Sequence, residues 1–295
     1  MRRGVQSLSI LVDENTKILV YGMTGNYGSA QVKAMLTAGS NIVAGVSVGK
    51  GGQEHMGIPI CDTALEAVEK YGANTGIIYV PSAGAKSALI EAIEAGVKVV
   101  FCPTEGIPNL DTIAIRQVAD AHDAWFIGPN SLGVISPGKS LVGSIAPAFT
   151  KPGAIGVISR SGTVTLAVAS CLTDNGLGQS TVISIGGDVI IGKNPLDYIK
   201  KFNEDDETKV VVMVGEIGGM KEYEVCEYMP QMKKPLVAFI GGRSAKPGKR
   251  MGHMGAMISG SKDDANSKAE ALKKAGAVVV GTPWDIPDAI KALGF

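Results

Sequence analysis

The sequence has few aromatic residues, no excess of either charge and no long apolar run. Aromatic residues make up 5% of the 295 residues, and lysine plus arginine equals aspartate plus glutamate at 28 each. The resulting formal net charge of zero gives no support for binding to nucleic acid or to an anionic membrane. No apolar stretch reaches the roughly 20 residues that a transmembrane helix needs. The opening Met-Arg-Arg also lacks the apolar core that follows in a secretory signal.

Cysteine is scarce as well, with only four residues that lie far apart in the chain. No two of them have CxxC spacing or the spacing of zinc ligands, so neither a disulfide framework nor a metal centre is expected. Scattered cysteines in a chain of this size are typical of a reduced compartment. We therefore expect a cytoplasmic protein, with an organelle matrix as the alternative.

The chain is rich instead in glycine, with 39 residues, and in hydrophobic residues, at 45%. Glycine permits the tight turns that join strands to helices and lets the backbone approach a ligand closely. The length is comfortable for two domains of ordinary size. Together these features favour an α/β protein with two domains.

Short apolar strands alternate with helices in the first half of the chain. The predicted strands lie at residues 17–21, 41–46, 75–80, 97–102 and 125–127, and the predicted helices near 29–37, 63–71, 85–95 and 112–121. Strands that are apolar throughout and separated by helices form parallel sheets covered on both faces. We predict a Rossmann-like domain over residues 1–130, with its ligand at the carboxyl ends of the strands.

A stretch rich in glycine and proline, residues 128–153, predicts the junction between the domains. The alternation then resumes, with strands predicted at 155–159, 181–185, 209–214, 236–240 and 277–280, and helices at 163–175, 196–203, 222–229, 265–275 and 286–293. This pattern predicts a flavodoxin-like α/β domain over residues 131–295, again with a mainly parallel sheet. Residues 241–262 have no predicted element, and loops of that length in compact domains are usually functional.

The first predicted strand is followed by a glycine loop in which Gly22, Gly25 and Gly28 have GxxGxxG spacing. Such a loop at the start of a helix suits a phosphate, because unpaired N–H groups and the helix dipole meet there. A tight turn without any ligand is the alternative. The next strand ends in Lys50 among glycines instead of the acid that an NAD site needs near this position. A cation favours coenzyme A or NADP over NAD.

His253 lies in a long basic segment, since residues 229–262 contain no carboxylate. Glycines on both sides leave its imidazole accessible, and nearby cations favour an anion on or near the ring. An incidental histidine in a solvated basic loop is the alternative. His55 is more readily explained by local hydrogen bonding, and His122 by exposure near a helix end.

Two further strand ends carry polar groups that suit the same chemistry. Ser161, Gly162 and Thr163 open a helix directly after a strand and could cap it or bind a phosphate. Glu216 follows another strand, and the carboxyl ends of parallel strands meet at one edge. The Glu216 carboxylate could therefore accept one ring N–H of His253 and leave the other nitrogen to attack. A solvated strand-end carboxylate is the alternative.

Several motifs in the same order make the chain resemble the alpha subunit of succinyl-CoA synthetase over nearly its whole length. They include GMTGNYG, GKGG, TEGIP, GPN, SRSGT, GGD, GEIGG and GHMGA. The resemblance implies an acid–CoA ligase of the kind that acts in the tricarboxylic acid cycle. Such a ligase forms an acyl-CoA thioester through a phosphohistidine and an acyl phosphate. It also implies ATP or GTP with Mg²⁺ on an ATP-grasp beta subunit, in a heterodimer or heterotetramer. The absence of the P-loop sequence GxxxxGK followed by Ser or Thr agrees with that division.

The resemblance also assigns roles to single positions. It implies that His253 carries the phosphoryl group, that Glu216 orients it, and that the phosphohistidine is received by Ser161, Gly162 and Thr163. The residues implied to bind coenzyme A are Thr24, Gly25, Asn26, Tyr27, Lys50, Pro103, Thr104 and Glu105.

The chain departs from succinate-using relatives near the expected acid site. Relatives commonly carry Tyr-Glu where this chain has Leu166-Ala167, and a lost tyrosine hydroxyl removes a hydrogen bond to a carboxylate worth about 1.5–3 kcal/mol. Leu166 is therefore a candidate substrate residue, and the carboxylic acid remains open between succinate, citrate and others. A coenzyme A-binding module without catalysis and an NADP oxidoreductase are the remaining alternatives.

Overall fold

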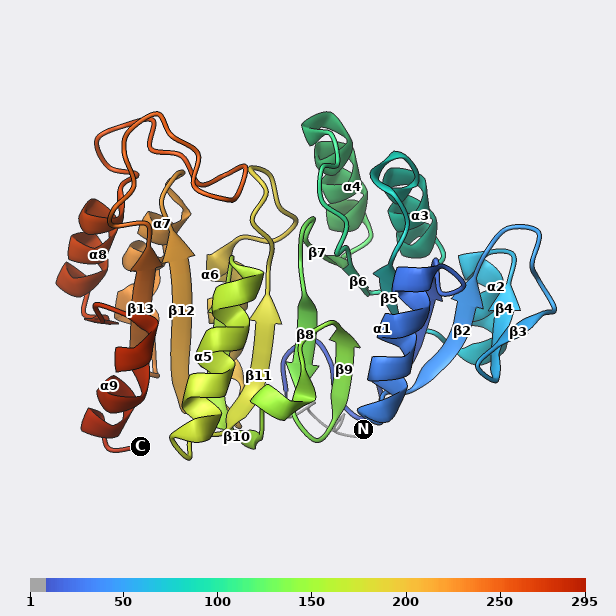
Figure 1. Cartoon of the computed structure of the whole chain (residues 1–295), viewed down its shortest axis with the longest axis horizontal. Helices are drawn as coiled ribbons and strands as arrows, with labels where there is room; N and C mark the ends of the chain where they lie inside the picture. The colour runs from blue at the N-terminus through green and yellow to red at the C-terminus, as the bar shows by residue number, and fades with distance from the viewer. Residues whose placement is uncertain (1–8) are drawn as a thin grey trace.

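The computed structural model describes residues 9–295, which form two sheets that stand side by side (Figure 1). Within this part of the chain the first sheet has seven strands in the order β3-β4-β2-β1-β5-β6-β7. Its strands are β1 (Ile18–Tyr21), β2 (Ile42–Val46), β3 (Glu54–His55), β4 (Ile58–Cys61), β5 (Thr75–Ile78), β6 (Val99–Phe101) and β7 (Trp125–Ile127). Apart from β3, which is antiparallel to β4, neighbouring strands are parallel, in the order typical of Rossmann folds.

Alternation along each strand divides the first sheet into two apolar faces. In β1, Ile18 and Val20 belong to one buried cluster, whereas Leu19 and Tyr21 belong to another. Helix α1 (Asn26–Thr37) packs on the first face, and the second is covered by α2 (Ala64–Tyr71), α3 (Ser82–Glu94) and α4 (Asn109–Ala121). Because both faces are buried, the strands read as continuous hydrophobic runs in the sequence.

The second sheet also has seven strands within the described residues, in the order β14-β13-β12-β10-β11-β8-β9. They are β8 (Gly133–Ser136), β9 (Ser140–Gly143), β10 (Pro152–Ser159), β11 (Gln179–Ser184), β12 (Val210–Glu216), β13 (Leu236–Gly241) and β14 (Val278–Val279). The parallel strands follow the order β11-β10-β12-β13-β14, which is the flavodoxin-like order. The prediction of two mainly parallel α/β sheets is thus confirmed.

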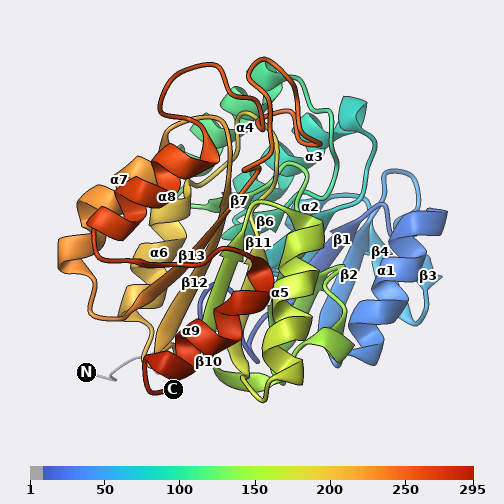
Figure 2. The same ribbon diagram turned by 60° about the vertical axis from the view of Figure 1, so that its left-hand side comes forward.

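Helices cover both faces of the second sheet, as Figures 1 and 2 show from two directions. On one face α5 (Gly162–Asp174) packs beside α9 (Ile286–Ala292), and on the other α6 (Pro195–Glu204), α7 (Lys221–Tyr228) and α8 (Ala265–Lys274) pack in succession. Short 3-10 helices lie at Pro147–Phe149, Met229–Gln231 and Pro283–Asp285. No helix within residues 9–295 is both long and apolar enough to cross a membrane.

The junction predicted over residues 128–153 contains more structure than expected. Strands β8 and β9 form an antiparallel hairpin that joins the edge of the second sheet by pairing β8 with β11. The glycines and prolines that suggested a break supply its turn, where Gly138 has φ of 80°. The chain leaves the first sheet after β7 and enters the second at β8, so the predicted domain boundary between residues 130 and 131 falls in this link. That the two parts are separate domains stays a prediction.

The loop from residue 241 to residue 264 arches over the carboxyl ends of β12 and β13 (Figures 1 and 2). The sequence predicts no element here, but the structure folds the loop into a narrow ribbon with an antiparallel bridge between Arg250 and Met257. The Met251 N–H donates to the Ala256 carbonyl at 2.9 Å and closes the tip that carries His253. The ribbon therefore presents this histidine at the edge where the strands end.

Candidate active site

The carboxyl ends of β10, β12 and β13 surround a cavity of about 380 Å³ beneath the long loop. Its lining includes Ser161 and Thr163 from the start of α5, Glu216 from the end of β12, and His253 from the loop tip. Val164, Ile217 and Phe239 add apolar surface. Residues that lie far apart in the sequence are thus brought to one site because parallel strands end on the same edge.

His253 is joined to Glu216 by the shortest polar contact of this cavity. Its Nδ1 lies 2.6 Å from Glu216 Oε2, and the carboxylate is almost fully buried. The hydrogen bond that His253 donates to Glu216 raises the pKa of His253, and burial of the ring opposes this rise. A carboxylate that accepts the Nδ1–H leaves Nε2 as the nucleophilic nitrogen of the neutral ring. The arrangement is that of a histidine prepared for covalent catalysis.

Arg160 holds the other side of the Glu216 carboxylate. Its guanidinium lies 3.3 Å from Glu216 Oε1, and the side chain is buried. The same group donates to the carbonyl oxygens of Gly186 at 3.3 Å and Asp188 at 2.7 Å. Arg160 therefore fixes both the carboxylate that contacts His253 and the segment that follows β11.

The segment after β11 packs directly against the histidine ring and connects it to the first sheet. A Cβ added at Gly187 would lie 2.4 Å from His253 Cγ, so only glycine leaves room for the imidazole. Asn130, which follows β7, donates to Asp188 Oδ1 at 3.4 Å. Burial raises the pKa of Asp188, although the hydrogen bond from Asn130 acts against this rise.

Helix α5 begins at the cavity, with Ser161 as its N-cap. The Ser161 hydroxyl accepts from the Val164 N–H at 3.4 Å, which leaves other N–H groups of the first turn without a side-chain cap. Gly162 follows the cap, and Thr163 is exposed. An anion in the cavity would meet the positive end of this helix dipole. Leu166, one turn further on, packs against the core and is not part of the cavity lining.

The residues predicted to bind coenzyme A lie at the carboxyl edge of the first sheet. Lys50, after β2, donates to Thr24 Oγ1 at 3.1 Å, so these two are in direct contact. Gly25, Asn26 and Tyr27 are exposed at the start of α1. This helix has neither a side-chain cap nor an acidic residue in its first turn. Its N–H groups are therefore available to an anionic group such as a phosphate.

Pro103, Thr104 and Glu105 follow β6 on the same edge, two strands away from β1. The Thr104 hydroxyl donates to the Val80 carbonyl at 2.7 Å, and the Thr104 carbonyl accepts from the Asn130 N–H at 3.0 Å. Glu105 is exposed, whereas Pro103 is half-buried. The segment thus spans the edge between the Thr24–Lys50 contact and the Asn130–Asp188 contact.

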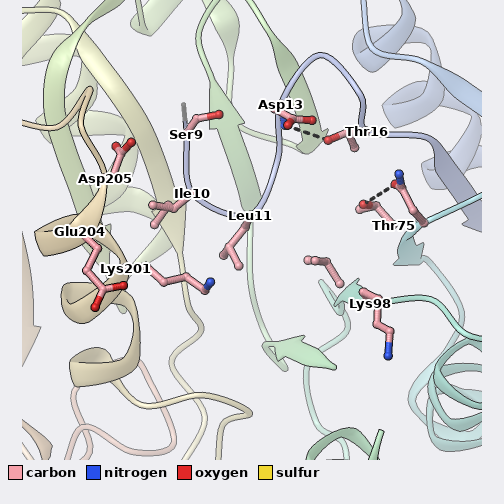
Figure 3. Close-up of a pocket in the computed structure, with 12 residues that line it drawn as sticks. Ser9, Ile10, Leu11, Asp13, Thr16, Thr75, Lys98, Lys201, Glu204 and Asp205 are labelled. Carbon is pink, nitrogen blue, oxygen red and sulfur yellow. Dashed lines mark hydrogen bonds between the residues drawn. The ribbon is translucent and has the colours of Figure 1, made fainter. Parts of the chain in front are cut away.

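A larger cavity of about 490 Å³ lies at the opposite, amino-terminal ends of the strands (Figure 3). Several of its polar lining groups have partners within the chain. Lys98 donates to the His122 carbonyl at 2.8 Å, Lys201 lies 4.7 Å from the centre of the Trp125 ring, and Asp13 accepts from the Asn15 N–H at 2.8 Å. None of the predicted site residues lines this cavity, so the candidate site is the one that contains His253.

Comparisons with known proteins match two separate stretches of the chain to family models. A family model described as a CoA binding domain matches residues 13–106, and one described as CoA-ligase matches residues 158–278. Succinate–CoA ligase (ADP-forming) subunit alpha 1 of Archaeoglobus fulgidus is 49% identical over 96% of this chain and 97% of its own. The corresponding subunit of Aquifex aeolicus is 46% identical over 96% of this chain and 94% of its own. The chain belongs to the succinate–CoA ligase alpha-subunit family.

Solved structures related to this succinate–CoA ligase family member include larger enzymes. An ATP citrate lyase from Methanothrix soehngenii, in complex with citrate and coenzyme A, superposes with a TM-score of 0.86 at 25% identity. The match covers 97% of this chain and 52% of that chain, so the present chain corresponds to about half of it. An acetyl-coenzyme A synthetase of Korarchaeum cryptofilum shares the fold, with a TM-score of 0.76 at 20% identity over 95% of this chain and 61% of its own.

The sequence motifs gave no role to Arg160, Gly187 or Asp188. Arg160 lies in the motif SRSGT, and Gly187 and Asp188 lie in GGD, so the sequence did mark all three positions as part of a family motif. Their roles depend on partners from other strands, however, which the motifs alone do not reveal. The Glu216–His253 contact was predicted, and the structure contains it.

Gly187→Ala is expected to lower the rate of thioester formation by this succinate–CoA ligase family member about 10- to 100-fold. The added methyl group would overlap the His253 ring, while the backbone at Gly187 does not require a positive φ. Gly260→Ala, in the loop that carries His253, is the control, because its Cβ would meet only Asp263, at 3.9 Å. Steady-state rates of the two variants with the beta partner measure the effect. Equal rates for both would contradict the steric role of Gly187.

Proposed function

We propose that this chain is the phosphoryl-carrying alpha subunit of an NDP-forming acid–CoA ligase, with His253 as the residue that carries the phosphoryl group. The single observation that supports this most is the hydrogen bond between His253 Nδ1 and Glu216 at 2.6 Å, inside a cavity that also contains the start of α5. A protein that only binds coenzyme A has no need of an oriented imidazole at a helix N-terminus. The same argument speaks against an NADP oxidoreductase.

The first step transfers the γ-phosphoryl group of ATP or GTP to His253. The Nε2 lone pair forms an N–P bond while the bond to the bridging oxygen breaks and the nucleoside diphosphate leaves. The Nδ1 proton stays in its hydrogen bond to Glu216, which stabilises the positive charge that develops on the ring. Ser161, Gly162 and Thr163 receive the phosphoryl oxygens at the start of α5.

Two further steps complete the ligation. A carboxylate oxygen of the acid attacks the phosphorus, the N–P bond breaks, and an acyl phosphate forms as His253 returns to the neutral ring. The coenzyme A thiolate then attacks the acyl carbon, the C–O bond breaks, and inorganic phosphate leaves with the formation of the thioester. Thr24, Gly25, Asn26 and Tyr27 hold the coenzyme A phosphates with Lys50 as their cation. Pro103, Thr104 and Glu105 guide the molecule toward the acyl phosphate.

The nucleotide and its Mg²⁺ are assigned to a beta partner of the ATP-grasp type, in a heterodimer or a heterotetramer. The relatives reported above are alpha subunits of ADP-forming ligases, which supports a beta partner and favours ATP over GTP. A reducing compartment such as the cytoplasm suits the four free cysteines.

Succinate is the first candidate for the acid because the most similar relatives reported above are succinate–CoA ligases. Citrate is the second, because an ATP citrate lyase solved with citrate and coenzyme A superposes on nearly the whole chain. The position of Leu166 outside the cavity lining leaves the choice to other residues, including those of the partner.

The proposed function is tested by mixing the chain with its beta partner, coenzyme A, and ATP labelled at the γ-phosphate. Label is expected on the chain, labile in acid and stable in base, as is typical of an N–P bond. Label is expected to leave as phosphate when succinate or citrate is added, with an equal amount of thioester. Acid-stable label, or thioester formed without a labelled intermediate, would contradict the proposal.

A further inference from the structure

Beneath Glu216 lies a buried ion pair that the reaction steps above do not use. Lys268 in α8 and Glu222 in α7 are joined at 2.6 Å between Nζ and Oε2. Their side chains are 0% and 2% exposed. Charged side chains are rarely buried so fully unless they are paired, as these two are.

Lys268 uses all three N–H donors of its ammonium group on one small region. Besides Glu222, it donates to the carbonyl oxygens of Glu216 at 2.8 Å and Gly218 at 2.7 Å. An ammonium group has three donors, so its hydrogen-bonding capacity is filled. The charge of Lys268 is thereby directed at the turn that carries the Glu216 carboxylate.

Glu222 contacts the backbone N–H of Glu216, whereas Lys268 contacts its carbonyl oxygen. Its Oε1 accepts from the Glu216 N–H at 3.5 Å, while its Oε2 accepts from Lys268. A Cβ at Gly215 would lie 2.9 Å from Glu222 Oε1, so the glycine there makes room for the carboxylate. The N–H and the carbonyl of Glu216 are therefore both bonded to members of the pair.

The turn held in this way is also the surface on which the histidine loop rests. Gly218 has φ of 86°, and a Cβ added to it would lie 2.1 Å from the Gly255 carbonyl oxygen. The Gly218 N–H donates to the Asp263 carbonyl at the base of the loop, at 2.8 Å. A displacement of residues 216–218 would therefore move both the carboxylate and the seat of His253.

We propose that Lys268 and Glu222 are positioning residues, which hold the backbone of Glu216 so that its carboxylate meets His253 Nδ1 during phosphoryl transfer. The inference rests on the proposed function of His253. Neither residue lines the cavity, so both act through Glu216. Because catalysis is sensitive to displacements of about 1 Å, loss of the pair lowers the rate of phosphoryl transfer.

Replacement of the Lys268–Glu222 pair by apolar side chains can distinguish the positioning role from a purely structural one. Replacing a buried ion pair by apolar side chains of similar volume is often neutral or stabilising, whereas removing one partner leaves an unpaired buried charge. The double variant Lys268→Met/Glu222→Leu is therefore the informative one. If the pair had only a structural role, the double variant would be as active as the wild type.

The double variant, assembled with the beta partner, is expected to show kcat lowered about 10- to 100-fold. The KM for coenzyme A is expected to stay the same, because the candidate coenzyme A residues lie on the other sheet. Lys139→Met/Glu207→Leu removes a second ion pair, of 2.8 Å, whose side chains are 23% and 31% exposed and in which Glu207 precedes β12, and this variant serves as the control. A kcat equal to that of this control overturns the proposal. Glu222→Asp, which keeps the charge but shortens its reach, provides the same comparison if the double variant does not fold.

Nitrogen NMR of the histidine-labelled full chain gives a readout that does not depend on activity. The His253 signal, identified by its loss in His253→Asn, is expected to show a proton on Nδ1 in the wild type and a mixture of tautomers in the double variant. An unchanged tautomer together with a lower kcat overturns the positioning role. If the wild-type chain itself takes no label from ATP, the proposed function fails, whereas equal labelling of wild type and double variant defeats the positioning inference alone.

Discussion

His253→Asn is expected to abolish phosphorylation of the chain and to lower thioester formation at least about 1,000-fold, the scale on which enzymes lose rate without their nucleophile. Asparagine fills part of the same space and can still donate a hydrogen bond to Glu216, but its amide nitrogen has no lone pair free to attack phosphorus. The measurement is transfer of label from ATP to the chain, followed by the rate of thioester formation.

His122→Asn is the matched control for that experiment. His122 is exposed after α4, and its Nδ1 lies 3.0 Å from the Val118 carbonyl, away from the cavity. Labelling of this variant is expected to equal that of the wild type. If His253→Asn retained the label, the phosphoryl group would have to reside elsewhere, and the mechanism proposed above would be wrong.

Glu216→Gln is expected to lower the maximal rate of phosphoryl transfer about 100- to 1,000-fold, somewhat less than loss of an orienting carboxylate costs in a serine protease triad. An amide can present its NH₂ group to Nδ1 and favour the tautomer in which Nε2 carries the proton. It also leaves Arg160, 3.3 Å from Oε1 in the wild type, without its counter-charge. Single-turnover labelling from ATP measures the effect, and a rate within a factor of about 3 of wild type would contradict it.

The pH dependence of labelling in Glu216→Gln gives a second, independent test of the role of Glu216. In the wild type the hydrogen bond that His253 donates to Glu216 raises the pKa of His253, so the ring becomes neutral and nucleophilic only as the pH rises through that raised value. Labelling is therefore expected to increase with pH over a range that lies above the ordinary histidine value of about 6.5. In Glu216→Gln the raising effect is lost, and burial of the ring and then Arg160 lower the pKa of His253, so the rise in labelling should move to lower pH. If labelling rose at the same pH in both proteins, Glu216 would not be the cause of the raised pKa of His253.

Much of the fold follows from local sequence pattern. Strand β1 is apolar along its length and β12 is apolar from Val210 to Val214, and each run is followed by glycine, so both their existence and their parallel arrangement were predictable. The hairpin β8–β9 was missed because its Pro137-Gly138 turn has the same composition as a linker. Strands β3 and β4 were missed as well, since β3 has only two residues and β4 contains Pro59, so neither leaves a clear periodic signal.

The site was predictable to the extent that it depends on where strands end. His253 and Glu216 were paired on that ground, and the glycine loop with Lys50 was recognised in the same way. Lys268 was not foreseen, because nothing local distinguishes it from the exposed lysines of α8. Its role arises from burial against Glu222, a contact between two helices that only the packed structure creates.

The segment that follows β11 ties the two halves of the molecule together. A Cβ at Gly186 would lie 2.0 Å from the Pro129 carbonyl oxygen, and the Gly192 N–H donates to the Gly128 carbonyl at 2.9 Å. Between these two points lies Gly187, which packs against the His253 ring. An engineer who exchanges the amino-terminal half for that of another ligase would thus have to transplant residues 186–192 from the same parent. A fusion made only in the link between β7 and β8 would pair residues 186–192 of one parent with a first sheet whose surface is not complementary to them.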